Sequence, residues 1–200
     1  VAVTDLAAYF DDEITAMPNL VTVGAANTLT TVAGIPFYQG DTGSIYTHDV
    51  SGTDDTATKN TAFGITAMDA ITTGDNNTAI GHGAMGANTT GLAATAVGSS
   101  ALKTNTTANF NVAVGYESLA LTTTGGHNTA VGTTAMYANT TGAHNTALGY
   151  GALLANTTGT RNLAIGFGAY DASDTENDNL AIGYNAMTTN TAGGTKNIAI

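Results

Sequence analysis

Apolar and polar positions recur with a seventeen-residue period from Asn60 to the end of the chain. The recurring phrase is Asn-Thr-Ala-(Val/Ile/Leu)-Gly, then two variable residues, then Ala-(Leu/Met), then a polar stretch that usually ends Asn-Thr-Thr-Gly. A fixed period in this range is typical of a stacked, quasi-one-dimensional protein. The first residues of the repeats, which we call the anchors, are Asn60, Asn77, Ala94, Asn111, Asn128, Asn145, Asn162, Asn179 and, one residue late, Asn197.

Numbering positions within each repeat from the anchor separates small residues from large ones. Position 3 is Ala throughout, position 5 is Gly in the full repeats, position 4 is a large apolar residue, and position 9 is Met, Leu or Tyr. The array spans residues 60–200, with eight repeats and the start of a ninth. The expected repeat core at positions 3 to 5 is Ala79, Ile80, Gly81, Ala96, Val97, Gly98, Ala113, Val114, Gly115, Ala130, Val131, Gly132, Ala147, Leu148, Gly149, Ala164, Ile165, Gly166, Ala181, Ile182 and Gly183.

The repeat predicts short strands, because seventeen residues are too few for a two-helix unit and Gly at position 5 weakens a helix. We expect positions 2 to 5 to form one strand, positions 6 to 9 a second, and the Asn-Thr-Thr-Gly tract a return loop. Alternation along the first strand is expected to turn Val or Ile toward a narrow interior, and Ala and Gly toward a closely approaching sister chain. The fold expected is an all-β repeat, a parallel β-roll or β-solenoid of 17-residue coils.

One chain is expected to be insufficient for this stack. Each coil carries two large apolar side chains at its regular positions, and their burial offsets only part of the conformational entropy lost when the coil is ordered. Burial of a second face against identical chains would add to the stability, so we expect a homotrimeric fibre. At about 4.8 Å per coil, eight coils would make a shaft segment of about 38 Å.

The first 59 residues differ from the array. Over residues 1–18 an apolar face recurs at helical spacing and Pro18 would end a helix, which predicts a short N-terminal helix. This helix could pack on its own domain or form a trimeric bundle with its copies. Residues 19–59 hold two strand-like runs, at 20–23 and 29–32, between turns rich in Gly, and they predict a small adaptor region.

Composition and charge limit the classes of partner that the chain is expected to bind. The chain has 200 residues, 25 Gly, no Cys and a net charge of −11. It has no basic stripe, which argues against nucleic-acid binding, and its acidic balance repels anionic membranes. The sequence contains no apolar span of twenty residues, so it does not predict a segment inserted in a membrane. Because residue 200 falls inside a repeat, we expect the natural protein to continue beyond it.

Two families resemble the array. Residues 145–159, which read NTALGYGALLANTTG, closely resemble repeats of bacteriophage tail-fibre proteins. The Ala-Ile-Gly-x-x-Ala core is similar to the head repeats of YadA-like trimeric autotransporter adhesins. The adhesin resemblance implies a trimeric, left-handed parallel β-roll with strands stacked along the fibre axis. It covers about seventy per cent of the chain, from residue 60 onward. The departures are a longer loop, an irregular seventh repeat and a last spacing of eighteen.

Two residue groups suggest ion binding. His127 and His144 hold the same position in successive repeats, so a metal or anion site is conceivable, but we favour a variable loop position. Four acids between Asp171 and Asp178 could form a calcium site. Because no acid spacing repeats, we favour a solvated loop there.

The remaining motifs have structural and functional interpretations. Aromatic residues at position 6 could bind sugars on a host surface, although we favour packing at a seam between chains. The Asn-x-Thr triplets match a glycosylation pattern but fit turn chemistry better. Rows of Thr suggest ice binding, which is disfavoured by the apolar residues that replace Thr at position 2: Val112, Leu163, Leu180 and Ile198.

These observations predict a structural, non-enzymatic protein with no catalytic residues, cofactor or metal. The chain has no nucleophile elbow, phosphate loop or zinc motif. We expect the trimeric shaft of a phage tail or capsid fibre on a virion, which projects a host-attachment tip. Residues 1–59 would join it to an anchoring protein. The alternative is a bacterial surface adhesin whose β-roll binds host matrix, glycan or protein.

Overall fold

The computed structural model describes residues 56–172, 174–188 and 194–200 of the chain, together with five short strands nearer the N-terminus. These strands are β1 (Thr22–Val23), β2 (Leu29–Val32), β3 (Ile35–Pro36), β4 (Tyr38–Gln39) and β5 (Ile45–Tyr46). β1 and β2 lie on the two runs predicted to be strands. The helix predicted over residues 1–18 lies outside the described residues.

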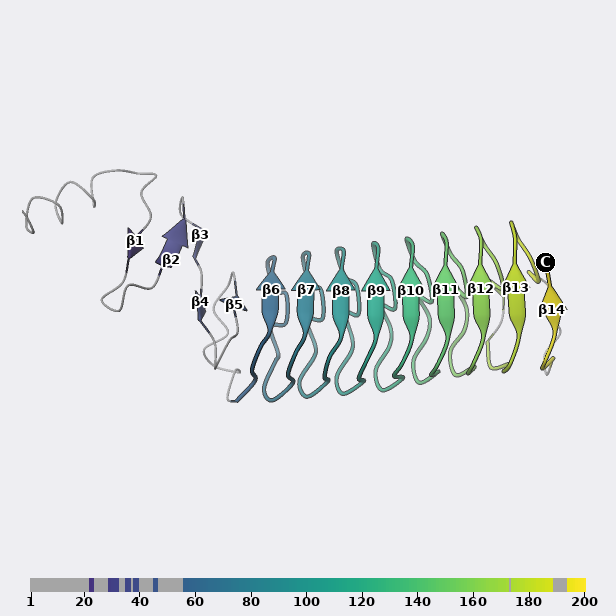
Figure 1. Ribbon diagram of the computed structural model, residues 1–200, viewed down its shortest axis with the longest axis horizontal. Helices are drawn as coiled ribbons and strands as arrows, with labels where there is room; N and C mark the ends of the chain where they lie inside the picture. Colours follow the sequence, from purple (N-terminus) through teal and green to yellow (C-terminus); the bar gives the residue numbers. More distant parts are fainter. Residues whose placement is uncertain are drawn as a thin grey trace, which may run out of the picture.

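The repeat array is a β-solenoid with one strand per coil (Figure 1). Each strand pairs in parallel with the equivalent strand of the next coil, without a shift, so that Ala130 lies opposite Ala113 and Ala147. β5 adds in parallel to the first strand of the array, and β4 pairs antiparallel with β5. The strands of the array are β6 (Thr61–Phe63), β7 (Thr78–Ile80), β8 (Thr95–Val97), β9 (Val112–Val114), β10 (Thr129–Val131), β11 (Thr146–Leu148), β12 (Leu163–Ile165), β13 (Leu180–Ile182) and β14 (Ile198–Ala199).

The all-β solenoid with seventeen-residue coils is thus confirmed, and the described residues contain no helix. The second strand predicted at positions 6 to 9 is wrong, because this segment is a series of turns. Its backbone enters the left-handed region twice per coil, as at Thr134 (φ 53°) and Met136 (φ 53°). Two left-handed residues separated by one other residue bend the chain around the core and prevent an extended strand.

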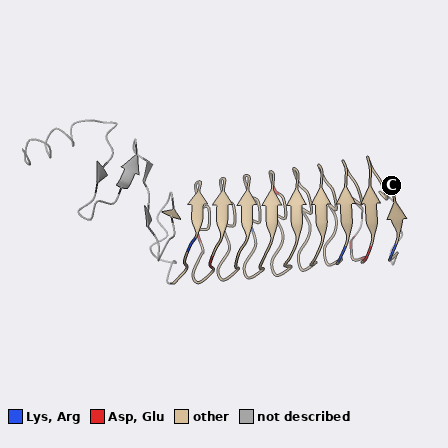
Figure 2. Cartoon of the chain, in the orientation of Figure 1, with Lys and Arg blue, Asp and Glu red and all other residues tan. Residues whose placement is uncertain are grey.

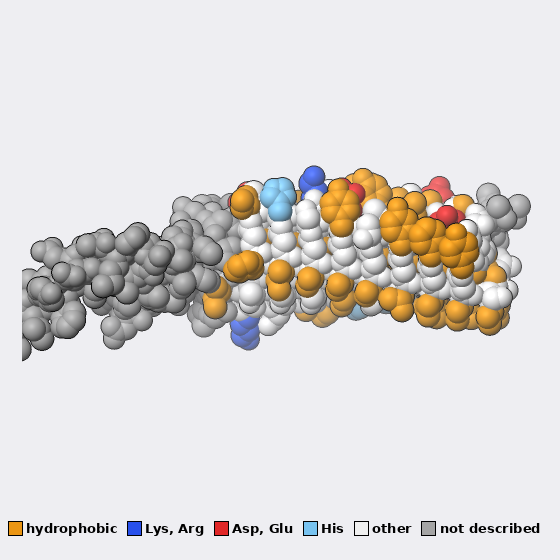
Figure 3. Space-filling model, turned by 90° about the horizontal axis from the view of Figure 1, so that it is seen from above, with side chains coloured by type: hydrophobic (Ala, Val, Ile, Leu, Met, Phe, Trp, Pro, Cys, Tyr) orange, Lys and Arg blue, Asp and Glu red, His pale blue; other side chains and the backbone are white. Residues whose placement is uncertain are grey.

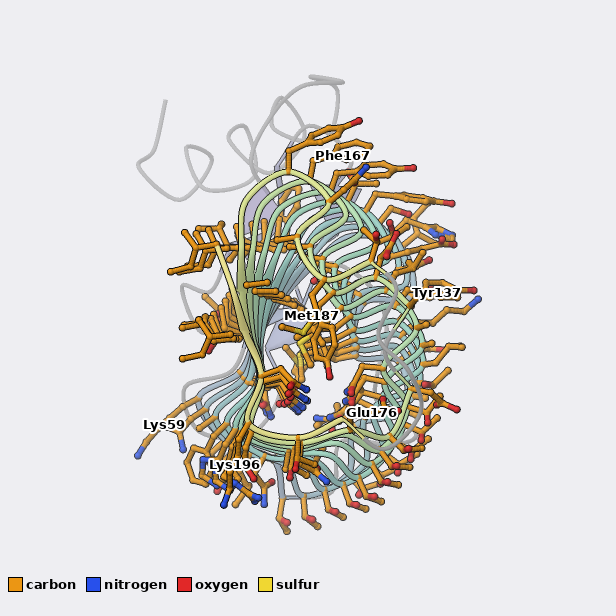
Figure 4. The ribbon with its side chains drawn as sticks, turned by 90° about the vertical axis from the view of Figure 1, so that its right-hand side faces the viewer. Lys59, Tyr137, Phe167, Glu176, Met187 and Lys196 are labelled. Carbon is orange, nitrogen blue, oxygen red and sulfur yellow. The ribbon has the colours of Figure 1, made fainter. Side chains whose placement is uncertain are left out.

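The interior of the solenoid is lined by small residues from the strand and one large residue from the turns. Ala at position 3 is buried, as are Ala at position 8 and the Met or Leu at position 9 in most coils. The predicted orientation of the strand is therefore wrong. Ala130 is fully buried, whereas Leu148, at position 4, is 47% exposed. The side chain at position 9, labelled at Met187 in Figure 4, points into the interior, to which the strand contributes only the methyl group of Ala at position 3.

The anchor asparagines form a buried ladder along one side of the interior. Each side-chain Oδ1 accepts a hydrogen bond from the backbone N–H of the next anchor; for example, the N–H of Asn145 donates to the Oδ1 of Asn128 at 2.9 Å. Each Nδ2 donates to a carbonyl late in its own coil, as from Asn128 to Gly142 at 2.8 Å. The ladder satisfies backbone groups that the turns leave without strand partners.

A second buried ladder runs through position 12, inside the tract predicted to be a return loop. The Nδ2 of Asn105 donates to the Oδ1 of Asn88 at 2.9 Å, and Asn156 donates to Asn139 at 3.0 Å. Thr122 takes the same position between these two pairs and is also buried. The polar tract is therefore part of the interior of the solenoid.

Candidate interaction surfaces

The outer face of the sheet carries an apolar residue at position 4 of every coil and either Thr or an apolar residue at position 2. Its side chains come from positions 2 and 4 of each coil, which point away from the interior. The large apolar residues exposed on it are Phe63, Ile80, Val112, Leu148 and Ile198. Between them, Val97, Val114, Val131, Ile165 and Ile182 are half-buried. A line of hydrophobic side chains runs the length of the solenoid in Figure 3, and charged residues are sparse along the coils (Figure 2).

One edge of this face carries the position 6 residues, which include a ladder of stacked rings. Tyr150, Phe167 and Tyr184 stack in series with centroid separations of 5.0 and 5.3 Å and interplanar angles of 9° and 13°. The faces of the middle ring are therefore covered by its neighbours. Because sugars stack on ring faces, this ladder offers a glycan mainly the ring edges and the two end faces.

The opposite edge carries the position 17 residues, one before each anchor. Phe110, His127 and His144 stack there, with successive centroids 4.9 Å apart. The period of the repeat predicted that these two histidines would lie at equivalent positions of adjacent coils, and the structure confirms it. Among the described residues, no group of three or more His, Cys, Asp or Glu side chains could hold a metal ion.

The edge formed by the position 17 residues also carries an exposed ion pair. The Nε of Arg161 donates to Oδ1 of Asp178 at 2.5 Å, and its Nη2 donates to Oδ2 at 2.9 Å. The hydrogen bonds from Arg161, together with its charge, hold the pKa of Asp178 below its ordinary value against a smaller effect of burial. Arg161 and Asp178 are equivalent residues of adjacent coils, so the pair ties one coil to the next.

The acids between Asp171 and Asp178 are spread around the coil. Asp174 accepts a hydrogen bond from the Thr157 hydroxyl of the preceding coil. Glu176 is buried, and its Oε2 accepts from the backbone N–H groups of Asp174 and Thr175 at 3.1 Å. Asp178 points to Arg161. This arrangement does not bring the oxygens of a calcium site to one point.

The Thr and Asn rows have structural roles. Thr hydroxyls at position 13 donate to the carbonyl of the equivalent residue one coil later, as from Thr89 to Thr106 at 3.0 Å. The Asn-x-Thr triplets that begin at Asn88 and Asn139 have their asparagine in the buried ladder, out of reach of a glycan. Thr at position 2 points outward rather than inward, but the row is broken by Val112 and Leu163, so it is not a regular hydroxyl lattice.

Comparison of the chain with protein-family models, with curated proteins and with solved structures gives no significant match. Within the described residues, none of the segments is a helix long and apolar enough to cross a membrane. The three surfaces described above, which are the outer sheet face and its two edges, are therefore the features that bear on function.

Proposed function

We propose that this chain is the shaft of a homotrimeric fibre that serves a structural, non-enzymatic role on a virion. The observation that supports this most is the apolar outer face of the sheet, which runs along every coil of the array. Large exposed apolar patches on soluble proteins mark interaction sites. A patch that repeats at every coil fits a partner that repeats in the same way, and a second copy of the chain is the simplest such partner.

Three copies can bury this face around a common axis. If each sheet turns its outer face inward, side chains such as Val131 and Ile165 meet those of two sister chains and form a core that one chain lacks. The fibre would then have two layers of packing: the interior of each solenoid and the apolar core between them. A shaft of this kind would hold a host-attachment tip away from the particle, and residues 1–59 would bind an anchoring protein.

The alternative is a bacterial surface adhesin whose shaft itself binds host matrix, glycan or protein. The exposed aromatic column at position 6 favours this second function, since aromatic side chains dominate many interaction surfaces. Binding of purified chain to immobilised host glycans or matrix proteins, lost on replacement of Phe167 by Ala, would support the adhesin. Electron microscopy of native particles with an antibody to residues 1–59 would distinguish a virion fibre from a cell-surface one.

Sedimentation equilibrium of the full chain tests the oligomer directly. We expect a single species with three times the chain mass at micromolar concentration. A well-folded monomer under the same conditions would contradict the proposal.

A further inference from the structure

The two edges of the apolar sheet face lie at opposite ends of each strand. Figure 4 labels Phe167 on the position 6 edge, and Lys59 and Lys196 on the position 17 edge, on either side of the sheet. Within one coil the two edge residues are six positions apart along a nearly extended segment, a separation of roughly 15–20 Å. They cannot touch each other within one chain.

Rotational symmetry would bring these edges together between chains. The inference rests on the proposed trimer with inward-facing sheets. In a closed ring of three identical chains, the contacts away from the symmetry axis join two different patches of neighbouring chains, and they join them at the same height along the axis. The end of a strand in one chain then meets the beginning of the equivalent strand in its neighbour. The residues that meet are the two that flank the same strand.

The side chains at these flanking positions match in size or chemistry at several coils. Both are small around β8 (Ser99 and Ala93), and both are aromatic around β9 (Tyr116 and Phe110). Around β13, the Tyr184 hydroxyl would find the carboxylate of Asp178. The other pairs are Ile65 with Lys59, His82 with Asn76, Thr133 with His127, Tyr150 with His144, and Phe167 with Arg161.

A shift of one coil breaks two of these matches. Ser99 would then face Phe110, and Phe167 would face Asp178, which places a small residue against a ring and an apolar ring against a carboxylate. All the residues concerned are accessible, since the flanking positions are exposed or half-buried in the single chain. Both edges are therefore available to a sister chain.

We propose that the position 6 edge of one chain docks on the position 17 edge of the next at the same coil level, and that these contacts set the register of the three chains. The stacked rings of each edge then form part of three seams along the fibre. The aromatic ladder of one chain then contacts the position 17 edge of a sister chain, which carries the histidines and Arg161.

Disulfide cross-linking of the full chain tests the register, because the chain has no Cys of its own. The double variant Ser99→Cys with Ala93→Cys should give a covalent species of three chains on oxidation. The control Ser99→Cys with Asn76→Cys differs by one coil, which moves the two Cα atoms beyond the roughly 7 Å that a disulfide spans. We expect at least ten times more covalent trimer from the first variant. Thr133→Cys with His127→Cys provides a second pair at the matched level.

The outcomes separate this proposal from the proposed function. Sedimentation under reducing conditions reports the number of chains, and oxidation reports which edges meet. Three chains with cross-links at both matched levels support the docking. Three chains that cross-link only in the shifted pair, or in none of the pairs, overturn it and leave the trimer intact. A folded monomer overturns both.

Discussion

Glycine at position 5 is the residue on which close stacking of the coils depends. These glycines have φ between 132° and 141°, which L-residues rarely adopt, and a Cβ added to Gly132 would lie 2.6 Å from the carbonyl carbon of Gly149. The close approach that the sequence indicates is therefore real, but it joins successive coils of one chain rather than two chains. Gly is required here for both its backbone conformation and its lack of a side chain.

Replacement of Gly132 by Ala should therefore lower the free energy of unfolding by roughly 2–5 kcal/mol, through backbone strain and overpacking together. Gly151→Ala is the matched control, because Gly151 has φ 61° and no atom lies within 4 Å of an added Cβ. The control should cost about 1–2 kcal/mol from the left-handed backbone alone. Urea denaturation followed by circular dichroism measures both variants, and equal losses would contradict the steric argument.

At the scale of the coil, the structure differs from the prediction made from the sequence pattern, and each difference has a physical reason. The strand at positions 2 to 4 could be predicted, because period and alternation are visible in the side chains. The turns at positions 6 to 11 could not, because their left-handed residues include Thr134, Glu117 and Met136, which carry no mark of that conformation. The orientation of the strand was predicted wrongly because size alone suggests that Val and Ile are buried, whereas position 9 already fills the interior.

The position 12 ladder is imperfect at Thr122, which offers a test of its role. Thr122 accepts a hydrogen bond from Asn139 at 3.3 Å, and the Oδ1 of Asn105 on its other side is buried without a hydrogen-bond partner. Replacement of Thr122 by Asn would supply an Nδ2 to Asn105 and an Oδ1 to Asn139, as in the regular rungs. We expect a gain of about 1 kcal/mol in the free energy of unfolding.

Thr122→Val is the companion variant for this ladder. It keeps the shape of the side chain but removes the acceptor for Asn139, so it should destabilise the chain by about 1–2 kcal/mol. Thermal unfolding of both variants against the native chain distinguishes the two effects. An Asn variant less stable than the native chain would show that the ladder does not govern stability at this rung.

The ion pair between Arg161 and Asp178 makes the contact between two coils depend on pH. Because the pKa of Asp178 is lower in the folded chain, the pair stabilises the fold above the ordinary carboxyl pKa and this contribution is lost as the pH falls below about 4. Asp178→Asn should flatten the decrease in stability over that range. Both side chains are exposed, so the effect should also shrink in 1 M salt, where screening is strong. An unchanged pH profile in the variant would contradict it.

At the scale of the whole molecule, the outer sheet face presents an apolar side chain at position 4 of every coil, from one end of the array to the other. The sequence predicted an oligomer from the shortage of apolar burial, and the outer sheet face is the surface that could supply it. The sequence favoured a variable loop position for His127 and His144 and a solvated loop for the acids between Asp171 and Asp178. In the structure the two histidines stack on each other, and Asp174, Glu176 and Asp178 make separate contacts. Linear spacing does not determine which way a residue points once the backbone bends at left-handed positions.

A charge on the apolar face should prevent assembly without unfolding the chain. Leu148→Glu would place three carboxylates in the proposed core, at a cost of roughly 3–5 kcal/mol for each unpaired buried charge. Leu154→Glu is the control, since Leu154 is 37% exposed at position 10, outside that face. Sedimentation should show monomers for the first variant and trimers for the second. Trimers in both would place the interface elsewhere.

The in-register pairing of coils also bears on how the gene for such a shaft can change. The bonds between successive anchors join a residue to its equivalent in the adjacent coil, as between Asn145 and Asn162 at 2.9 Å. Recombination that inserts or deletes one whole repeat would leave every remaining bond intact and alter the reach of the shaft by about 4.8 Å. A coil can also differ by one residue without breaking the anchor ladder, because the backbone N–H of Asn197 donates to the Oδ1 of Asn179 at 2.9 Å across the spacing of eighteen. Selection can thus tune the reach in discrete steps while the cross-section stays constant.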